Sequence, residues 1–600
     1  MHVHMHHGQP LTEINETEIL MWHLPTPPSY WSIDIENPDP TVARYPGLIA
    51  LHVTFMILAF FVALPAGIAL RSAKHHWHAF TVLIFYSLCG LGCAASALYR
   101  KLTPDMYQGS IHASHGYLVI LSSLVLSAVD TVAFFIRLYE FARSSRKLAV
   151  KSFWHEIVLG REAYDSSSNY TGLNAEDPDE YDEIKPLGTM SPQGSHAQTD
   201  RPAVNIETQN LDDQYPAAWS NETTQPGHRS TYSAASDRTV FAIDSPRDPR
   251  HSDETLRDVL LQLPPRPRKP VQQVLAVAYA TLERLLVFAA FGMILTGIVV
   301  YSGGCRNNYI NGCLAHLIKG GIFWCYGLFT FARFLGSHSE MGWAWNISPI
   351  GNTISAEFVE SSVIFLYGIS NTWMERFGAH PGDPYTTKQV QHISIAVMFW
   401  FAGLVGMAME SRRFRNWLAA SATSALDPSH SANISEPPSY RGSFNPFPAL
   451  VIGVTGAAMS AHAQTYLFQV QIHQLWGWLL LGFSVLRCFT YFFLWLNPPS
   501  SILPSRPPTE ALGSFFLACG GLMFMLSTEE ITLAAMRRGR DGKSNNFPSH
   551  PYLTFITDMM MFLNVAVAIT CFAFCWTLCV VALNGWLKHR NSRHVFSPAS

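Results

Sequence analysis

Hydrophobic residues in this chain are gathered into runs of membrane-spanning length, and short polar segments separate the runs. A helix that crosses a bilayer needs about 20 mostly apolar residues. The runs do not alternate apolar and polar positions as barrel strands do, and lipid requires every backbone group to be satisfied within the segment, so they predict helices. We predict about eleven spans, at 47–70, 77–99, 111–137, 274–301, 314–335, 356–373, 390–410, 446–466, 473–497, 510–535 and 553–586.

One long polar segment interrupts this pattern between the third and fourth spans. The loop 141–270 is rich in Ser, Thr, Asp, Gln and Pro, so it cannot bury enough apolar surface to offset the entropy of ordering, and we expect disorder. The fold class is therefore an all-α polytopic membrane protein with two helical bundles joined by a disordered loop. The predicted divisions are a His-rich tail (1–46), a three-span domain (47–140), the loop (141–270), a multi-span domain (271–586) and a second tail (587–600).

Composition agrees with a chain that lies mainly in the bilayer. Hydrophobic residues make up 48% of the chain and charged residues 14%, whereas soluble proteins carry about 25% charged residues. The mean hydropathy of +0.12 averages the polar loop with the apolar runs. A net charge of -3 gives no electrostatic reason to expect a nucleic-acid partner. The sequence LPPRPRKP at 263–270 is either a polyproline ligand for a cytosolic adaptor or a stiff basic anchor before the fourth span.

The distribution of basic residues predicts the orientation. The first 46 residues hold one Arg or Lys, Arg44, and a glycosylation sequon at Asn15, which places the N-terminus outside, in a plasma membrane or endomembrane. The loop with Arg71 and Lys74 and the long loop then lie inside. Arg537 and its two following arginines disagree, because they follow the tenth span and should lie outside.

Two cysteines stand apart from those in the hydrophobic runs. Cys305 and Cys313 bracket the polar hairpin RNNYING between the fourth and fifth spans. If that hairpin faces an oxidising compartment, we expect a disulfide.

Histidines in the first three spans are candidate haem ligands. His52 and His115 lie at similar depths in the first and third spans, near the outer leaflet, and two such imidazoles can hold a b-type haem as axial ligands. Gly116 would let the flat ring approach the backbone. His78 begins the second span at the inner side, where the fourth span offers no histidine partner. The alternative is that these histidines, with His112, are interfacial and hydrated.

A second group of polar residues falls on one leaflet in the later spans. Imidazoles with a carboxylate at a shared depth are ligands for zinc, copper or iron. Interfacial polarity and a proton or ion path are the alternatives. The proposed metal ligands are His392, His462, His473 and Glu529, with His316 and Glu530 nearby. The N-terminal MHVHMHH could capture copper or zinc weakly, or have no role.

Two acidic residues share a face at the inner end of the sixth span. Glu357 and Glu360 lie three residues apart. Together with Glu410 at the end of the seventh span they could admit a cation or proton, they could be hydrated by lipid headgroups, or they could pair with Arg333 or Arg412.

Several segments resemble the fungal YTP-type family of transmembrane proteins. They are 284–305, 314–337, GWAWN at 342–346, SAEFVESSVIFLYG at 355–368, 391–411, QIHQLWGW at 471–478 and 505–525. The likeness covers most of 284–585, and the family carries no established activity to transfer. The first three spans resemble the domain that accompanies it, which is similar to the haem-binding core of the ascorbate-reducing cytochrome b superfamily. His52 and His115 match that core and His78 is a partial third ligand, but the fourth histidine is missing.

Three functions remain open at this point. The first is a membrane redox protein with haem on His52 and His115. The second is a metal-ion or proton transporter without haem, which would use the later His/Glu set and Glu360. The third is a scaffold whose loop recruits cytosolic partners. The sequence contains no Walker loop, dinucleotide fingerprint, HExxH or GxSxG, which argues against an ATP-driven pump or a familiar hydrolase.

Overall fold

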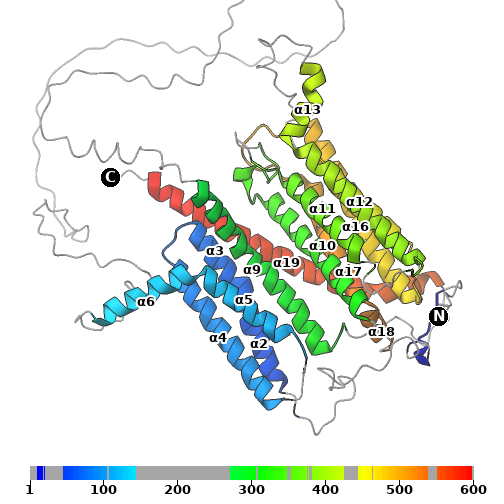
Figure 1. The fold of residues 1–600 in the computed structure, drawn as a ribbon, viewed down its shortest axis with the longest axis horizontal. Coiled ribbons are helices and arrows are strands. Elements are labelled where there is room, and N and C mark those ends of the chain that lie inside the picture. Colours follow the sequence, from blue (N-terminus) through cyan, green and yellow to red (C-terminus); the bar gives the residue numbers. More distant parts are fainter. Residues whose placement is uncertain are drawn as a thin grey trace, which may run out of the picture. The chain divides into compact units, whose positions relative to one another are not determined.

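The structure is a computed structural model, and the part of the chain that it describes is almost entirely helical (Figure 1). It describes residues 10–19, 43, 45–143, 270–423, 444–537, 539 and 551–596, apart from gaps at 18, 105–106, 108, 306–308, 348–352, 375, 377–381 and 463. The predicted loop 141–270 therefore lies outside the described residues from 144 to 269, as do the N-terminal histidine tract and Arg538 and Arg540.

The first group of helices contains the predicted first four spans. The first span is α2 (Pro46–Leu58) and α3 (Leu64–Ser72), joined by a π-helical turn at Ala59–Ala63. It packs on α4 (His78–Leu102), which shares a small apolar core with it around Phe60, Phe85 and Cys89. Helix α9 (Pro270–Ser302) packs against α3 and α5 (His112–Leu126). The predicted fourth span thus lies with the first three.

The second group is built from pairs of helices in close contact. Helix α10 (Ile310–Leu335) packs on α17 (Pro508–Leu526), and α17 also packs on α16 (Leu467–Leu496). Two further pairs join α11 (Ala356–Met374) with α12 (Thr387–Glu410) and α15 (Phe447–Ser460) with α16. The main core of the described residues lies here, with Trp476 stacked on Phe524 at a ring separation of 4.1 Å.

One long helix contacts both groups. Helix α19 (Pro551–Phe596) packs against α3 in the first group and against α10 and α17 in the second. The Trp576 indole N–H donates to the Phe61 carbonyl oxygen at 2.7 Å. The two groups are therefore linked through the last helix as well as through the chain.

The predicted all-α membrane-spanning fold is confirmed. Among the described residues, eight helices are long and apolar enough to cross a membrane. A ninth crossing is available if α5 and α6 (Ala128–Arg143), bent by 69°, form one span. The predicted sixth and eighth spans are the helices α11 and α15, which do not reach that standard; α15 has 14 residues. The predicted tenth span ends early, because α17 stops at Leu526 and a separate α18 (Glu529–Arg537) follows.

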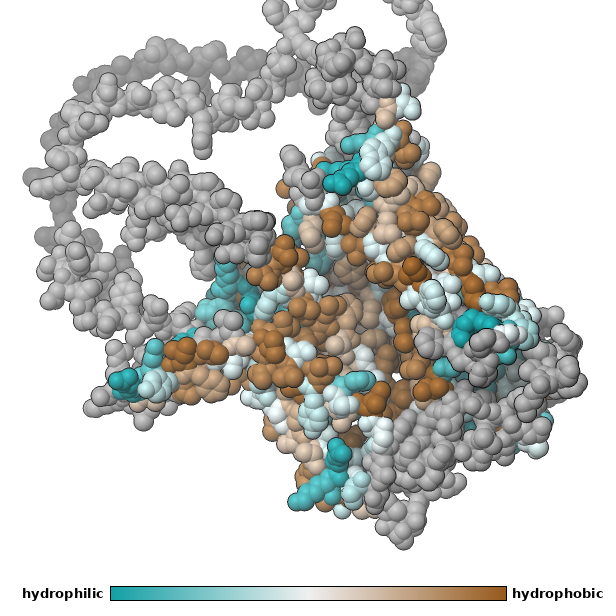
Figure 2. All heavy atoms as spheres, viewed as in Figure 1, coloured by the Kyte–Doolittle hydropathy of each residue, from teal (hydrophilic) through white to brown (hydrophobic). Residues whose placement is uncertain are grey.

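The surface fits a bilayer environment. Figure 2 shows hydrophobic residues spread over the flanks of the helices, with hydrophilic residues gathered toward their ends. Large apolar side chains are exposed along α4, α5, α9 and α12, among them Leu91, Tyr117, Ile298 and Phe401. Lipid tails can cover such surface, which would be costly in water.

Candidate functional site

Two histidine rings meet at one end of the first helix group. His52 on α2 and His112, the first residue of α5, have ring centroids 6.4 Å apart and planes at 84°. The His52 Nδ1–H donates to the Gly92 carbonyl oxygen on α4 at 2.9 Å. The His112 Nδ1–H donates to the Thr296 hydroxyl on α9 at 2.9 Å, since that hydroxyl donates its own proton to the Met293 carbonyl oxygen. In each neutral ring, Nε2 therefore keeps the lone pair.

The structure does not bring His52 to His115, the partner proposed from the sequence. His115 lies one turn further along α5 and its side chain is exposed. His112 and His115 share a helix face, so sequence spacing could not tell which ring would meet α2. His112 is also packed closely against α9, because a Cβ at Gly297 would lie 3.2 Å from its Cε1.

His78 belongs to a separate polar cluster near the predicted inner end of the first group. Its Nδ1–H donates to the Gly67 carbonyl oxygen at 3.1 Å, and its Nε2 lies 3.4 Å from Asp130 Oδ2. Arg71 reaches the same carboxylate at 3.4 Å and Glu283 on α9 at 3.9 Å. The Tyr279 hydroxyl contacts the Arg71 guanidinium. These side chains line a cavity of about 50 Å³. Because its Nε2 faces Asp130, His78 belongs to this cluster and not to the site of His52.

The later histidines form two further pairs. His316 and His473 each lie six residues after the first residue of their helices, Ile310 and Leu467, and their ring centroids are 5.8 Å apart. Each Nδ1–H donates to a carbonyl oxygen one turn earlier, on Gly312 at 2.7 Å and on Gln469 at 2.8 Å. His392 and His462 form the other pair, with centroids 5.8 Å apart.

The structure divides the metal ligands proposed from the sequence between these pairs. His473 lies with His316, and His392 lies with His462, whose Nδ1 contacts Gln391 at 3.1 Å. Among the described residues, the one group of three potential ligands with mutual distances within 4.8 Å is Cys305, Cys313 and Glu530. A metal cannot bind these sulfurs as thiolates, because the two cysteines form the predicted disulfide. Glu530 instead accepts the Cys305 backbone N–H at 2.7 Å, and Glu529 lies near Tyr309.

The second group also holds a network of buried charges. Arg333 donates to Glu360 at 2.6 Å and to Glu357 at 2.8 Å. Arg487 donates to Glu510 at 2.7 Å and lies 3.5 Å from the other oxygen of Glu360. All five side chains are at most 7% exposed. Glu360 therefore joins two ion pairs that span α10, α11, α16 and α17.

Sequence reasoning found only part of this network. The sequence offered pairing of Glu357 and Glu360 with Arg333 as one of several alternatives, whereas it did not indicate the roles of Arg487 and Glu510. Each is an ionisable residue in or beside an apolar run, and this is the signal that could have found them. Glu410 lies beside the network, where it accepts the Ser355 hydroxyl at 2.7 Å.

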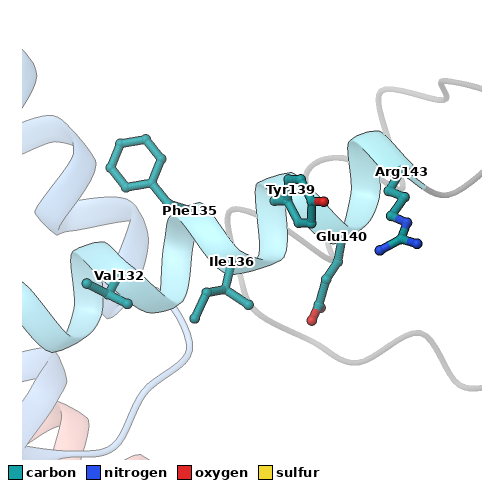
Figure 3. A pocket seen from close by; sticks show the side chains of 6 residues that line it. All are labelled: Val132, Phe135, Ile136, Tyr139, Glu140 and Arg143. Carbon is teal, nitrogen blue, oxygen red and sulfur yellow. The ribbon is translucent and has the colours of Figure 1, made fainter.

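A hollow on α6 offers no comparable site. Figure 3 shows that the side chains lining it project from this helix alone. They include the exposed Val132, Phe135 and Tyr139. Glu140 and Arg143 also line the hollow, so it is a mixed face of one helix to which the described residues of other helices add no side chain.

Comparisons with known proteins agree with the fold. The family model "Protein YTP1-like, C-terminal" matches residues 289–585, and "Domain of unknown function (DUF2427)" matches 37–135. The chain is 30% identical over 575 residues to the uncharacterized membrane protein C3B8.06 of Schizosaccharomyces pombe, covering 93% of this chain and 97% of the relative. It is 25% identical over 267 residues to protein YTP1 of Saccharomyces cerevisiae, covering 44% and 49% of the two chains. No solved structure matches it.

Proposed function

The chain belongs to the YTP1-like family of multi-pass membrane proteins, and we propose that it is a membrane redox protein that binds a b-type haem between His52 and His112. One observation carries the proposal, namely the separation of the two rings. A metal-bound imidazole nitrogen lies about 2 Å from its ion, so two rings on opposite sides of one ion, as the axial ligands of a haem are, have centroids roughly 6–6.5 Å apart. The observed separation is 6.4 Å.

The hydrogen bonds of the two rings support the same role. Metal-binding histidines usually donate their other ring N–H to a fixed acceptor, which sets the tautomer and the ring orientation. Gly92 and Thr296 are those acceptors here. The helices α4 and α9 thus hold the two rings, and a bound haem would supply one-electron transfer at its iron.

The proposal changes one ligand relative to the expectation from the sequence. His112 takes the place of His115, whose side chain is exposed. His78 is left out, because its Nε2 faces Asp130. A reduced-minus-oxidised absorbance spectrum of the purified protein tests the ligand set. We expect His52→Ala and His112→Ala to abolish a b-type spectrum.

A second candidate function rests on a different pair. The ring centroids of His316 and His473 are 5.8 Å apart, between the roughly 5 Å expected of two rings on a tetrahedral ion and the roughly 6.3 Å expected of two rings on opposite sides of an ion, and both Nδ1 atoms are held by carbonyl oxygens. These contacts favour a transition-metal site between His316 and His473. A metal-ion transporter would need such a site to bind the ion that it carries. Metal analysis of His52→Ala separates this function from the first. Zinc, copper or iron retained there and lost in His316→Ala would support it, and a metal-free protein would contradict it.

We also propose that the N-terminus and the hairpin 305–313 face the lumen or the exterior. A disulfide persists in an oxidising compartment, and the hairpin contains one. Asn15 should then carry a glycan that Asn15→Gln removes, which electrophoresis before and after deglycosylation would detect. An unmodified Asn15 together with labelling of Glu16→Cys only in permeabilised cells would contradict this orientation. Recruitment of an adaptor by the loop 141–270 stays a prediction.

A further inference from the structure

The buried charge network in the second helix group has one more acidic side chain than basic ones. The carboxyl groups belong to Glu357, Glu360 and Glu510 and the guanidinium groups to Arg333 and Arg487. If all five groups were ionised, the network would carry one net negative charge. Burying an uncompensated charge is strongly unfavourable, whereas one added proton makes the network neutral.

The contacts of the three carboxyl groups differ. Glu360 is bound through both oxygens, Oε1 by Arg333 and Oε2 by Arg487. Glu357 accepts from Arg333. Glu510 is bound through Oε1 only, and its Oε2 is buried without a hydrogen-bond partner among the described residues. An ionised carboxylate oxygen left in that state would bear the full cost of its lost hydration.

We propose that Glu510 binds a proton at Oε2 and that the five-residue network is a proton-exchange site. The Glu510 carboxylate takes up one proton from water to form an O–H bond, and releases it as the reverse step, so no other reactant is needed. This site is separate from the haem proposed on His52 and His112, because none of its residues lies in the first helix group.

The position of Glu510 suits exchange with one side of the membrane. Glu510 is the third residue of α17 and Glu357 the second residue of α11, and Arg333 lies two residues before the end of α10. By the predicted topology these ends share the inner side.

The charged and titratable groups around Glu510 and its partners come from three helices. They are Arg487 and Tyr491 on α16, Arg333 and Tyr326 on α10, and Glu357 and Glu360 on α11.

Infrared difference spectroscopy of the full chain in lipid vesicles tests the proposal. At neutral pH the wild type should show a side-chain carboxylic acid C=O band that is lost in Glu510→Gln, since glutamine keeps the shape of the neutral acid. Glu340→Gln is the matched control, because this exposed glutamate lies outside the network, and it should leave the band unchanged. His52→Ala should also retain the band, which makes this test independent of haem.

A second variant keeps the proposal testable if Glu510→Gln fails to fold. Glu357→Gln removes one negative charge elsewhere, so the two remaining carboxylates balance the two guanidinium groups and the band should again be lost. Absence of the band in the wild type at neutral pH would overturn the proposal. So would its persistence in folded Glu510→Gln or in Glu357→Gln.

Discussion

Single residues in this protein are positioned mainly by polar contacts made inside the helix groups. Arg333 shows how much depends on one side chain, because it donates to two carboxylates and to the Trp343 carbonyl oxygen while being 1% exposed. Its guanidinium also lies 4.4 Å from the centre of the Trp345 ring. If this side chain is removed, no bulk water reaches the buried carboxylates to take its place as their hydrogen-bond donor.

Replacing Arg333 with methionine should therefore destabilise the second helix group. The change leaves Glu357 and Glu360 with less compensation, and breaking a buried pair costs about 3–5 kcal/mol. Thermal unfolding of the detergent-purified protein would measure the effect. Arg413→Met, at an exposed position on α13 (Arg412–Thr423), is the control and should stay within about 0.5 kcal/mol. A similar unfolding temperature for both variants would contradict the importance of the network.

The sequence could anticipate which residues matter better than which residues meet. Glu357, Glu360 and Arg333 were candidates for pairing because ionisable groups in apolar runs need partners. The contact between Arg487 and Glu510 depends on how α16 and α17 turn toward each other, which periodicity does not reveal. The choice of His112 over His115 has the same origin, because the two residues share a helix face and differ only by one turn.

At the scale of helices, close packing through glycine brings the elements of the second group together. A Cβ at Gly521 of α17 would lie 2.4 Å from the Trp324 backbone nitrogen and 2.6 Å from the Gly320 carbonyl oxygen on α10. Gly456 and Gly477 make the same kind of contact between α15 and α16. Small residues at such crossings allow helices in lipid to gain dispersion energy, since no hydrophobic effect drives their association there.

The substitution Gly521→Ala should thus force α10 and α17 apart. The new methyl group meets backbone atoms that cannot rotate away, and overpacking of this kind costs about 1–3 kcal/mol or more. Gly292→Ala in α9 is the matched control, because nothing lies within 4 Å of its added Cβ. It should be neutral or slightly stabilising. Equal loss of folded protein on heating in the two variants would contradict this account of the interface.

The hydrophobic runs of the sequence predict the order of the helices along the chain. They do not predict where helices bend or break, or which helices pack together. Each of the eleven predicted runs falls on helix, but only eight helices of the described residues, or nine with the bent pair, are long and apolar enough to be spans. The runs did not reveal the bend between α5 and α6 or the break at Ser527 and Thr528 before α18. Nor did they show that α9 packs with the first group. These features depend on contacts between helices rather than on the apolar content of each.

At the scale of the whole molecule, contacts between distant segments tie the chain together. The N-terminal stretch lies against the start of α16, where the Leu11 N–H donates to the Thr465 carbonyl oxygen at 2.9 Å. Glu16 accepts two hydrogen bonds from Arg537, at 2.7 and 2.9 Å. The N-terminal stretch, the start of α16 and the end of α18 therefore lie side by side. Arg537, which conflicted with the predicted orientation, is neutralised by an acidic residue of the N-terminal tail.

The contact of Glu16 with Arg537 should depend on pH. Hydrogen bonds from Arg537 hold the pKa of the Glu16 carboxyl below its usual value. A lowered folded-state pKa means that the stabilisation is present above the usual carboxyl range and is lost as pH falls through the folded value. Hydrogen-exchange protection of Leu11 and Ile19 should therefore drop in acid, and at neutral pH in Glu16→Gln. Unchanged protection in that variant would contradict the role of this ion pair.

The haem proposal is tested most directly by the reduced-minus-oxidised spectrum of His112→Ala beside that of His115→Ala. Both residues lie on α5, three positions apart, and only His112 meets His52. We predict a b-type spectrum in the wild type and in His115→Ala, and its loss in His112→Ala. A spectrum that survives in His112→Ala, or a wild type without one, would contradict the account.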